Sequence, residues 1–221
     1  MKYIILFILV SCATVPSNVS ISPEQKIKSI CYNFSGKSRI ELGDHSYVAS
    51  AESIVENKHW KFALTFPLYG EELLDMSWED FKREGLVMHG GVRARLLNGF
   101  KDYIEKNNVT LDPQIIIKLL GYNALIVKTL AEQKNYLAKC SLKSKNAYTC
   151  PLELPQSQGV ISSHWLFDSQ QITITLSLSP SLNFKIVFFA EKEGFFHRIT
   201  LSMENQKYFT QEIFVNSCAA L

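Results

Sequence analysis

Thiol groups are the side chains of this sequence whose chemistry is best defined. The chain contains five cysteines, Cys12, Cys31, Cys140, Cys150 and Cys218. Cys12 belongs to an N-terminal segment that is considered below. The other four are an even number, which in an oxidising compartment predicts two disulfides, and four cysteines allow three connectivities.

The positions of the four cysteines favour one of these connectivities. Cys140 and Cys150 flank the polar segment Ser141–Thr149, which suits a closed loop, while Cys31 and Cys218 lie near the two ends of the folded part. We therefore predict Cys140–Cys150 and Cys31–Cys218, and the longer loop is worth up to about 4 to 5 kcal/mol in the chain-entropy model. The alternative is a metal site, but the C-x-x-C spacing typical of such sites is absent, so we predict no metal and no cofactor.

No pattern of residues predicts catalysis. The sequence has no G-x-S-x-G, no H-E-x-x-H and no glycine-rich phosphate loop. A triad assembled from distant segments leaves no such motif. The histidines are scattered without the spacing of metal ligands: His45, His59, His89, His164 and His197. We therefore predict that the protein is not an enzyme.

The N-terminus has the pattern of an export signal. Met1 and Lys2 precede the apolar run Tyr3–Val10, which is too short to span a bilayer and suits a signal-peptide core. Leu9-Val10-Ser11-Cys12 resembles the lipobox of bacterial lipoprotein signal peptides. This resemblance implies that residues 1–11 are removed and that Cys12 is lipidated. The alternative is an ordinary secretory peptide cut a few residues later, and both interpretations export the protein.

The remaining sequence divides into a tether and one domain. Residues 12–23 are rich in Ser, Pro, Thr and Asn, so they bury too little apolar surface to fold alone. Residues 24–221 have the length of a single domain. The hydrophobic content of the chain is 47% and its formal charge is +2, which gives no electrostatic case for nucleic-acid binding. Since no second apolar run is long enough to cross a membrane, we expect membrane attachment through the lipid alone.

Residues Lys61–Trp78 predict a hairpin that turns at Pro67–Gly70. Phe62, Leu64 and Phe66 alternate with polar or small residues. Leu74, Met76 and Trp78 alternate with Leu73 and two polar residues, so each strand has one apolar face. Ser38–Leu42 and Tyr47–Ile54, joined at Gly43-Asp44, predict a preceding hairpin after a turn at Ser35-Gly36. Gly85–His89 predicts a further strand. Gln25–Phe34 is ambiguous between helix and strand.

Helical spacing follows in the middle of the chain. Apolar residues recur every three or four positions over Gly91–Lys106, and Asp112-Pro113 begins a second helix that ends at Gly121. Ala124–Ala138 predicts a third. From Ala147 the alternation has a period of two, over Ile172–Ser179, Asn183–Ala190, Phe195–Met203 and Lys207–Val215. The sum predicts an α+β protein with one large antiparallel sheet and short mid-chain helices on one face.

The layout resembles the outer-membrane lipoprotein receptor LolB and its relatives in the LolA/LolB-like (lipoprotein localisation factor) superfamily. The resemblance rests on Ala63–Leu74 (ALTFPLYGEELL), on Asp112–Gly121 and on the lipobox and tether. It implies a curved, unclosed half-barrel whose apolar cavity takes up acyl chains beneath a lid of helices. It also implies that Leu68, with Tyr69 beside it, contacts membrane or cargo from an exposed loop. The two disulfides and the third helical segment are departures from this pattern.

A wide, curved sheet beneath short helices either fills its interior or leaves room for a ligand. The candidate lining of such a cavity consists of large apolar residues at alternating strand positions: Phe62, Leu64, Phe66, Leu74, Met76, Trp78, Ile174, Leu176, Phe184, Ile186 and Phe188. The alternative for each of them is an ordinary place in the core.

Two hypotheses about function follow from these predictions. The first is a lipid-anchored carrier or receptor, placed on the outer membrane facing the periplasm, that binds acyl chains such as palmitate on lipoproteins or lipids. Such a receptor would exchange cargo with a periplasmic carrier protein. The second is a structural envelope lipoprotein with a packed core that docks another protein through a face or edge of its sheet.

Overall fold

The described part of this computed structural model is one antiparallel sheet with little helix. The structure describes residues 22–42, 44–56, 59–67, 70–77, 126, 129–130, 136–153, 160–179, 182–204 and 209–219. Its elements are α1 (Pro23–Lys28), β1 (Asn33–Leu42), β2 (His45–Glu56), β3 (His59–Phe66), β4 (Gly70–Ser77), the 3-10 helix η1 (Tyr136–Lys139), β5 (Ser141–Ser144), β6 (Ala147–Glu153), β7 (Val160–Phe167), β8 (Gln171–Ser179), β9 (Leu182–Lys192), β10 (Phe195–Glu204) and β11 (Phe209–Ala219).

Two sets of consecutive antiparallel strands, β1–β4 and β5–β11, form the sheet. They are joined where β1 pairs with β11. The described strands have the order β4-β3-β2-β1-β11-β10-β9-β8-β7-β6-β5 in an 11-stranded sheet, and every neighbouring pair is antiparallel. β1 pairs with β11 from Asn33 opposite Ala219 to Leu42 opposite Phe209. The strands of the two predicted N-terminal hairpins and the predicted C-terminal strands are therefore both present.

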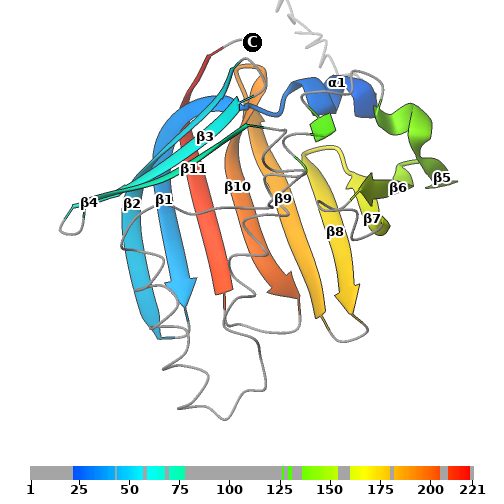
Figure 1. Cartoon of the computed structure of the whole chain (residues 1–221). Helices are drawn as coiled ribbons and strands as arrows, with labels where there is room; N and C mark the ends of the chain where they lie inside the picture. Colours follow the sequence, from blue (N-terminus) through cyan, green and yellow to red (C-terminus); the bar gives the residue numbers. More distant parts are fainter. Residues whose placement is uncertain are drawn as a thin grey trace, which may run out of the picture.

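The sheet is bent rather than flat. In Figure 1, β3 and β4 run steeply across the direction of β8–β10 instead of continuing alongside them. Phe62 on β3 and Phe188 on β9 line one small cavity, although five steps of the strand order separate these strands. In a flat sheet, five steps would place them about 24 Å apart. The sheet therefore curls until its own inner face meets itself.

The predicted α+β class, with helices covering one face, is wrong. The described residues are almost all in antiparallel strands, and the helices with described bounds are the six-residue α1 and one 3-10 turn. The curl gives the physical reason, since β3 supplies part of the cover over the inner face that we had assigned to helices. The predicted strand at 85–89 and the helices at 91–106 and 112–121 lie outside the described residues. Within the predicted helix 124–138, Ile126, Thr129 and Leu130 are helical.

The start of the folded part resolves the ambiguity of residues 25–34 by dividing them. Ser22 caps α1 by accepting a hydrogen bond from the backbone N–H of Gln25, whose side chain accepts one from the N–H of Ser22. Pro23 follows at the first helical position. The helix ends at Lys28, and β1 begins at Asn33.

The predicted turn at Ser35-Gly36 is wrong, because β1 continues through it. The pairing of β1 with β11 shifts register between Ser35 and Gly36, as at a β-bulge. A Cβ atom built on Gly36 would overlap the backbone carbonyl of Phe214. Glycine is therefore present because β11 approaches closely. The predicted hairpins are confirmed at Gly43-Asp44, where Leu42 pairs with His45, and at residues 67–70, where Phe66 pairs with Gly70.

Candidate ligand-binding face

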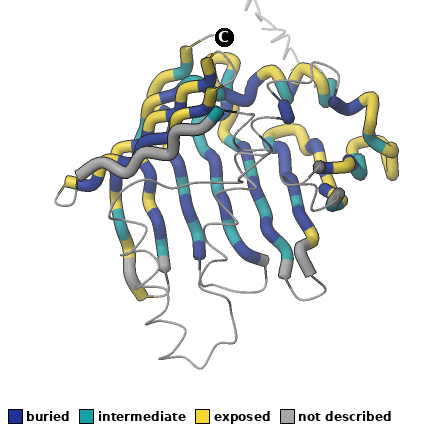
Figure 2. The backbone as a smooth tube through the Cα atoms, viewed as in Figure 1, coloured by how far each residue is buried: buried dark blue, intermediate teal, exposed yellow. Residues whose placement is uncertain are grey.

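The inner face of the sheet is a continuous apolar surface, and the predicted lining residues that the structure describes all lie on it. Figure 2 shows the alternation of buried and exposed positions along the strands. The side chains that belong to the buried core, each at most 6% exposed, are Phe62, Leu64, Phe66, Ile174, Leu176, Phe184, Ile186 and Phe188. Ile174 is paired with Ile186, and Leu176 with Phe184, so adjacent strands present apolar pairs.

The other predicted site residues are not placed. Leu74 and Met76 lie on β4, whose side chains at these positions are not described. Trp78, the loop residues Leu68 and Tyr69, and Cys12 lie outside the described residues.

Aromatic residues that were not predicted complete the inner face. Trp60 stacks on Phe62 with ring centroids 5.7 Å apart, and Trp165 stacks on Phe167 at 6.3 Å. Each buried indole N–H has an acceptor, because Trp60 Nε1 donates to Ser53 Oγ (3.0 Å) and Trp165 Nε1 donates to a serine hydroxyl on its own strand. Trp60 was detectable in the sequence, since it continues the alternation of Phe62, Leu64 and Phe66.

A small enclosed cavity lies where β3 meets the centre of the sheet. Its volume is about 20 Å³, which is room for about one water molecule. Apart from the hydroxyl groups of Ser53 and Tyr32 its side chains carry no oxygen, and the Ser53 hydroxyl already accepts the Trp60 N–H. The cavity is lined by Ile30, Cys31, Tyr32, Phe34, Ser53, Trp60, Phe62, Phe188, Ile199 and Ile213.

One wall of this cavity is the segment that enters the sheet, residues 22–32, which we call the strap. Ile30, Cys31 and Tyr32 of the strap line the cavity. The backbone carbonyl of Ser29 accepts a hydrogen bond from the Phe196 N–H (3.0 Å), and the Ser29 hydroxyl donates to Glu191 Oε1 (2.8 Å). The strap is therefore attached to the β9–β10 hairpin just before it reaches the cavity.

Burial perturbs two titratable groups of the strap. Lys26 on α1 is buried, and desolvation lowers the pKa of its ammonium group despite the opposing attraction of Asp168 and Glu191. Burial raises the pKa of the Tyr32 phenol. Both groups are therefore held away from water.

The predicted disulfides are confirmed. Cys31 is bonded to Cys218 across 187 residues of sequence, and this bond fastens the strap to the end of β11. Cys140 is bonded to Cys150 across 10 residues, closing the loop that contains β5. The first bond therefore fastens the end of the strap next to β1, and the second is confined to the other end of the sheet.

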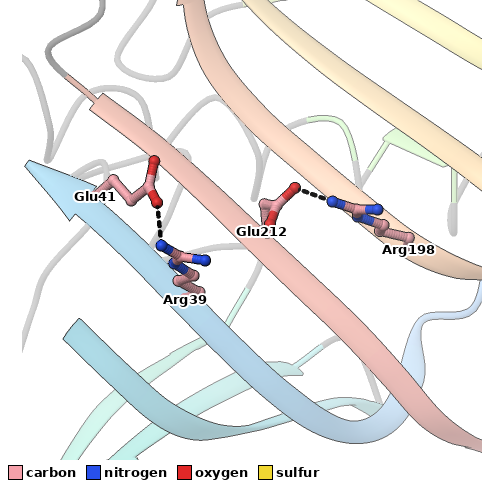
Figure 3. A network of polar contacts seen from close by, with 4 residues as sticks. All are labelled: Arg39, Glu41, Arg198 and Glu212. Atoms are coloured by element: carbon pink, nitrogen blue, oxygen red, sulfur yellow. Dashed lines mark hydrogen bonds and ion pairs between the residues drawn. The ribbon is translucent and has the colours of Figure 1, made fainter. Parts of the chain in front are cut away.

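The outer face carries charged and aromatic side chains. The Arg198 guanidinium carbon lies 4.9 Å from the ring centre of Phe189 and 5.1 Å from that of Phe214, and the side chain is ion-paired with Glu212. Arg39 and Glu41 form a second pair at 2.8 Å on β1 (Figure 3). The exposed Arg39–Glu41 pair and the half-buried Arg198–Glu212 pair give the outer face a polar character that contrasts with the inner one.

An open groove of about 700 Å³ crosses the ends of β1, β2 and β11 on the outer face. Phe34, Ser53 and Val55 contribute to it, but their side chains are buried in the core. The lining residues that alternate with these and face outward are Asn33, Ser35, Glu52, Ile54, Glu56, Ser217 and Ala219. The sequence did not predict this groove, because it requires residues of three strands that pair over long sequence distances.

No group of three or more His, Cys, Asp or Glu side chains within the described ranges could hold a metal ion. His164 Nδ1 lies 3.2 Å from Thr149 Oγ1, and both ring nitrogens of His197 lie 3.1 Å from backbone carbonyl oxygens. Among the helices that the structure describes, none is long and apolar enough to cross a membrane.

No protein-family model matches this chain, and a search of curated proteins also finds no match. Any assignment of function therefore depends on the geometry of the inner and outer faces.

Proposed function

We propose that the protein is an exported lipoprotein, anchored through Cys12, that binds acyl chains of lipoproteins or lipids on the inner face of its curled sheet. The observation that carries this proposal is the unclosed sheet with a continuous apolar and aromatic inner face. The lipobox and the two disulfides support an oxidising envelope compartment. We place the protein at the outer membrane, facing the periplasm, where it exchanges cargo with a soluble carrier protein as a distant LolB-like receptor.

Acyl-chain binding requires the enclosed cavity to grow. Pockets that bury a drug-sized ligand have volumes of about 300 Å³ or more, whereas this cavity has about 20 Å³. The strap supplies Ile30, Cys31 and Tyr32 to the cavity wall, and it crosses the sheet without being one of its strands. We infer that movement of the strap opens the cavity and exposes Trp60, Phe62 and Phe188.

The free energies make this opening feasible. Burying about 14 methylene groups of an acyl chain contributes about 11 kcal/mol, at about 0.8 kcal/mol for each group. Exposing the buried Ile30 side chain costs about 2 to 3 kcal/mol. Displacing the strap also breaks the two hydrogen bonds made by Ser29, each worth about 1 kcal/mol. This gain is larger than the two losses together, and the difference is available to offset the cost of ordering the bound acyl chain.

Native mass spectrometry tests the proposal. We expect the Cys12-free form, purified from membranes, to carry a bound lipid and to take up a fluorescent fatty acid after delipidation. Recovery without any lipid, together with no uptake, would contradict acyl-chain binding.

The exposed apolar side chains of the outer face favour a second candidate, protein docking without a ligand. Val48 on β2 is 56% exposed and Phe214 on β11 is 38% exposed, although the next positions on the same face of each strand are polar. If docking is the function, Val48→Ser and Phe214→Ser together should abolish capture of an envelope partner and leave fatty-acid uptake unchanged. The acyl-binding proposal predicts uptake by wild-type protein, which the docking function does not require.

A further inference from the structure

A hairpin with a concentrated positive charge forms one edge of the sheet. This basic hairpin, residues 139–150, consists of the end of η1, the edge strand β5 and the start of β6. Lys139, Lys143 and Lys145 are exposed in it, and residues 136–152 include no Asp or Glu. None of the three lysines is ion-paired with another residue that the structure describes. The hairpin therefore presents three positive charges and no negative one.

An apolar side chain projects from the middle of these charges. Leu142, 61% exposed, is the most exposed large hydrophobic residue of the described part of the chain. It lies beside Lys143, and all four residues of β5 are exposed. Lysines alone protect an edge strand from pairing with another chain, whereas an exposed leucine among them works against that protection. The combination indicates a surface that meets an apolar phase with an anionic border.

The basic hairpin is held in one conformation before it meets any partner. The Cys140–Cys150 bond closes it at its base, where Cys150 is fully buried. The Tyr136 hydroxyl donates to the backbone carbonyl oxygen of Pro151 (2.8 Å), which fastens η1 to β6. Leu142 and the lysines are therefore presented to a partner at a small cost in ordering.

The start of the strap lies on the same side of the molecule as the basic hairpin. The Asn146 carbonyl, in the hairpin turn, accepts the backbone N–H of the residue before Asp168 (2.9 Å), and the Asp168 carboxylate attracts the Lys26 ammonium of α1. Figure 1 shows α1 and the hairpin of β5 and β6 on this shared side. Ser22 is ten residues after Cys12, and ten residues of extended chain span at most about 35 Å. A lipid on Cys12 therefore turns this side toward the bilayer.

The carboxylates on this side lie outside the basic hairpin, and most of them are already engaged. Asp168 accepts a hydrogen bond from the Ser169 hydroxyl, Glu191 accepts one from the Ser29 hydroxyl, and Glu193 is ion-paired with Lys192. Glu24 on α1 is exposed, but α1 also carries Lys26 and Lys28. Across α1, the basic hairpin and the β7–β8 and β9–β10 turns, basic residues outnumber acidic ones. This side is therefore complementary in charge to an anionic surface.

We propose that the basic hairpin docks on an anionic lipid bilayer, where Leu142 enters the boundary between headgroups and acyl chains and the lysines pair with lipid phosphates. The orientation rests on the lipid anchor proposed above, whereas the contact itself uses only the hairpin. It is a second attachment, distinct from acyl-chain binding on the inner face.

Vesicle co-sedimentation of the Cys12-free protein tests the contact without the anchor. The vesicles contain phosphatidylglycerol and phosphatidylcholine in equal amounts, and pure phosphatidylcholine vesicles are the comparison. We expect binding to the anionic vesicles that weakens as salt is added, since exposed charges are screened. The variant K143Q/K145Q should lose roughly tenfold in partitioning, because it removes two cations from the anionic surface. Leu142→Ser should also lose roughly tenfold, because it removes the inserted apolar side chain.

Two matched controls make the same changes elsewhere. K37Q/R39Q removes the same charge from the outer face of β1, and Val48→Ser removes an exposed apolar side chain of β2. Both should bind anionic vesicles as the wild type does, and circular dichroism should show every variant folded. The proposal is overturned if the wild type binds neither kind of vesicle, if it binds both equally, or if the controls weaken binding as much as the hairpin variants.

Fatty-acid uptake separates this proposal from acyl-chain binding. K143Q/K145Q should take up fatty acid as the wild type does, because the basic hairpin lies outside the cavity. Vesicle binding without any uptake would contradict acyl-chain binding and leave the membrane contact in place. Uptake without vesicle binding would mean that the lysines only protect the edge strand, and would contradict the membrane contact.

Discussion

At the scale of single residues, backbone approach and hydrogen-bond pairing explain positions that hydrophobicity does not. Gly36 lies where the backbone of β11 approaches β1 so closely that a Cβ atom would overlap the carbonyl of Phe214. Ser53 is a polar residue in an apolar core because it accepts the N–H of Trp60. Phe214 is far from Gly36 in the sequence, and no sequence pattern pairs Ser53 with Trp60.

We predict that Gly36→Ala destabilises the protein by about 1 to 3 kcal/mol, because the new methyl group must displace the carbonyl of Phe214. Urea denaturation with both disulfides intact measures the effect. Ser46→Ala, at an exposed position on the neighbouring strand, is the control and should change stability by less than about 0.5 kcal/mol. An unchanged midpoint for Gly36→Ala would contradict the close approach.

We predict that Ser53→Ala costs about 1 to 3 kcal/mol, because the buried Trp60 N–H loses its acceptor. The same denaturation experiment measures it. Wild-type stability in the alanine variant would contradict a stabilising role for this hydrogen bond, and would mean that only the size of the side chain matters at this position.

At the scale of elements, the strap is the part whose attachment can be changed without altering a strand. It is fastened at the Cys31–Cys218 bond and at the β9–β10 hairpin, and it carries the buried Lys26. These attachments account for its closed position over the cavity. They also predict how stability and ligand uptake respond when each is removed.

Removing the Cys31–Cys218 bond should release the strap. In the chain-entropy model, C31S/C218S costs about 5 kcal/mol of stability, and C140S/C150S costs about 3 kcal/mol because its loop is shorter. We expect the first variant, under conditions where circular dichroism shows it folded, to take up fatty acid faster than wild type. The variant C140S/C150S should take up fatty acid at the wild-type rate. Equal uptake rates in both variants would mean that movement of the strap does not control access to the cavity.

The buried Lys26 predicts a dependence of stability on pH. Its pKa is lowered in the folded protein, so the unfolded chain binds more protons as pH approaches the ordinary lysine value of 10.5. The contribution of Lys26 to the free energy of unfolding therefore rises with pH between its lowered pKa and 10.5. Lys26→Met removes the desolvation penalty and should stabilise the protein by about 1 kcal/mol at neutral pH. If the stability of Lys26→Met depended on pH in the same way as that of the wild type, Lys26 would not be the group responsible.

At the scale of the whole molecule, local patterns predicted the strands but not their curvature. The alternation of Ile172, Ile174 and Leu176 and the turn at Pro67 are local signals, and the strands they indicated are present. The covering of the inner face by β3 is a contact between segments far apart in sequence, so it was assigned wrongly to helices. The described lining residues lie on the inner face as predicted, whereas the strap and the outer groove depend on the pairing of β1 with β11.

The central claim is that the inner face of the curled sheet receives an acyl chain. A fatty acid with a photoactivatable group at its terminal carbon, crosslinked to the Cys12-free protein and mapped by peptide mass spectrometry, measures this directly. We predict crosslinks in peptides that contain Trp60, Phe62 or Phe188. Crosslinks confined to peptides with outer-face residues such as Val48 or Phe214, or none at all, would contradict it.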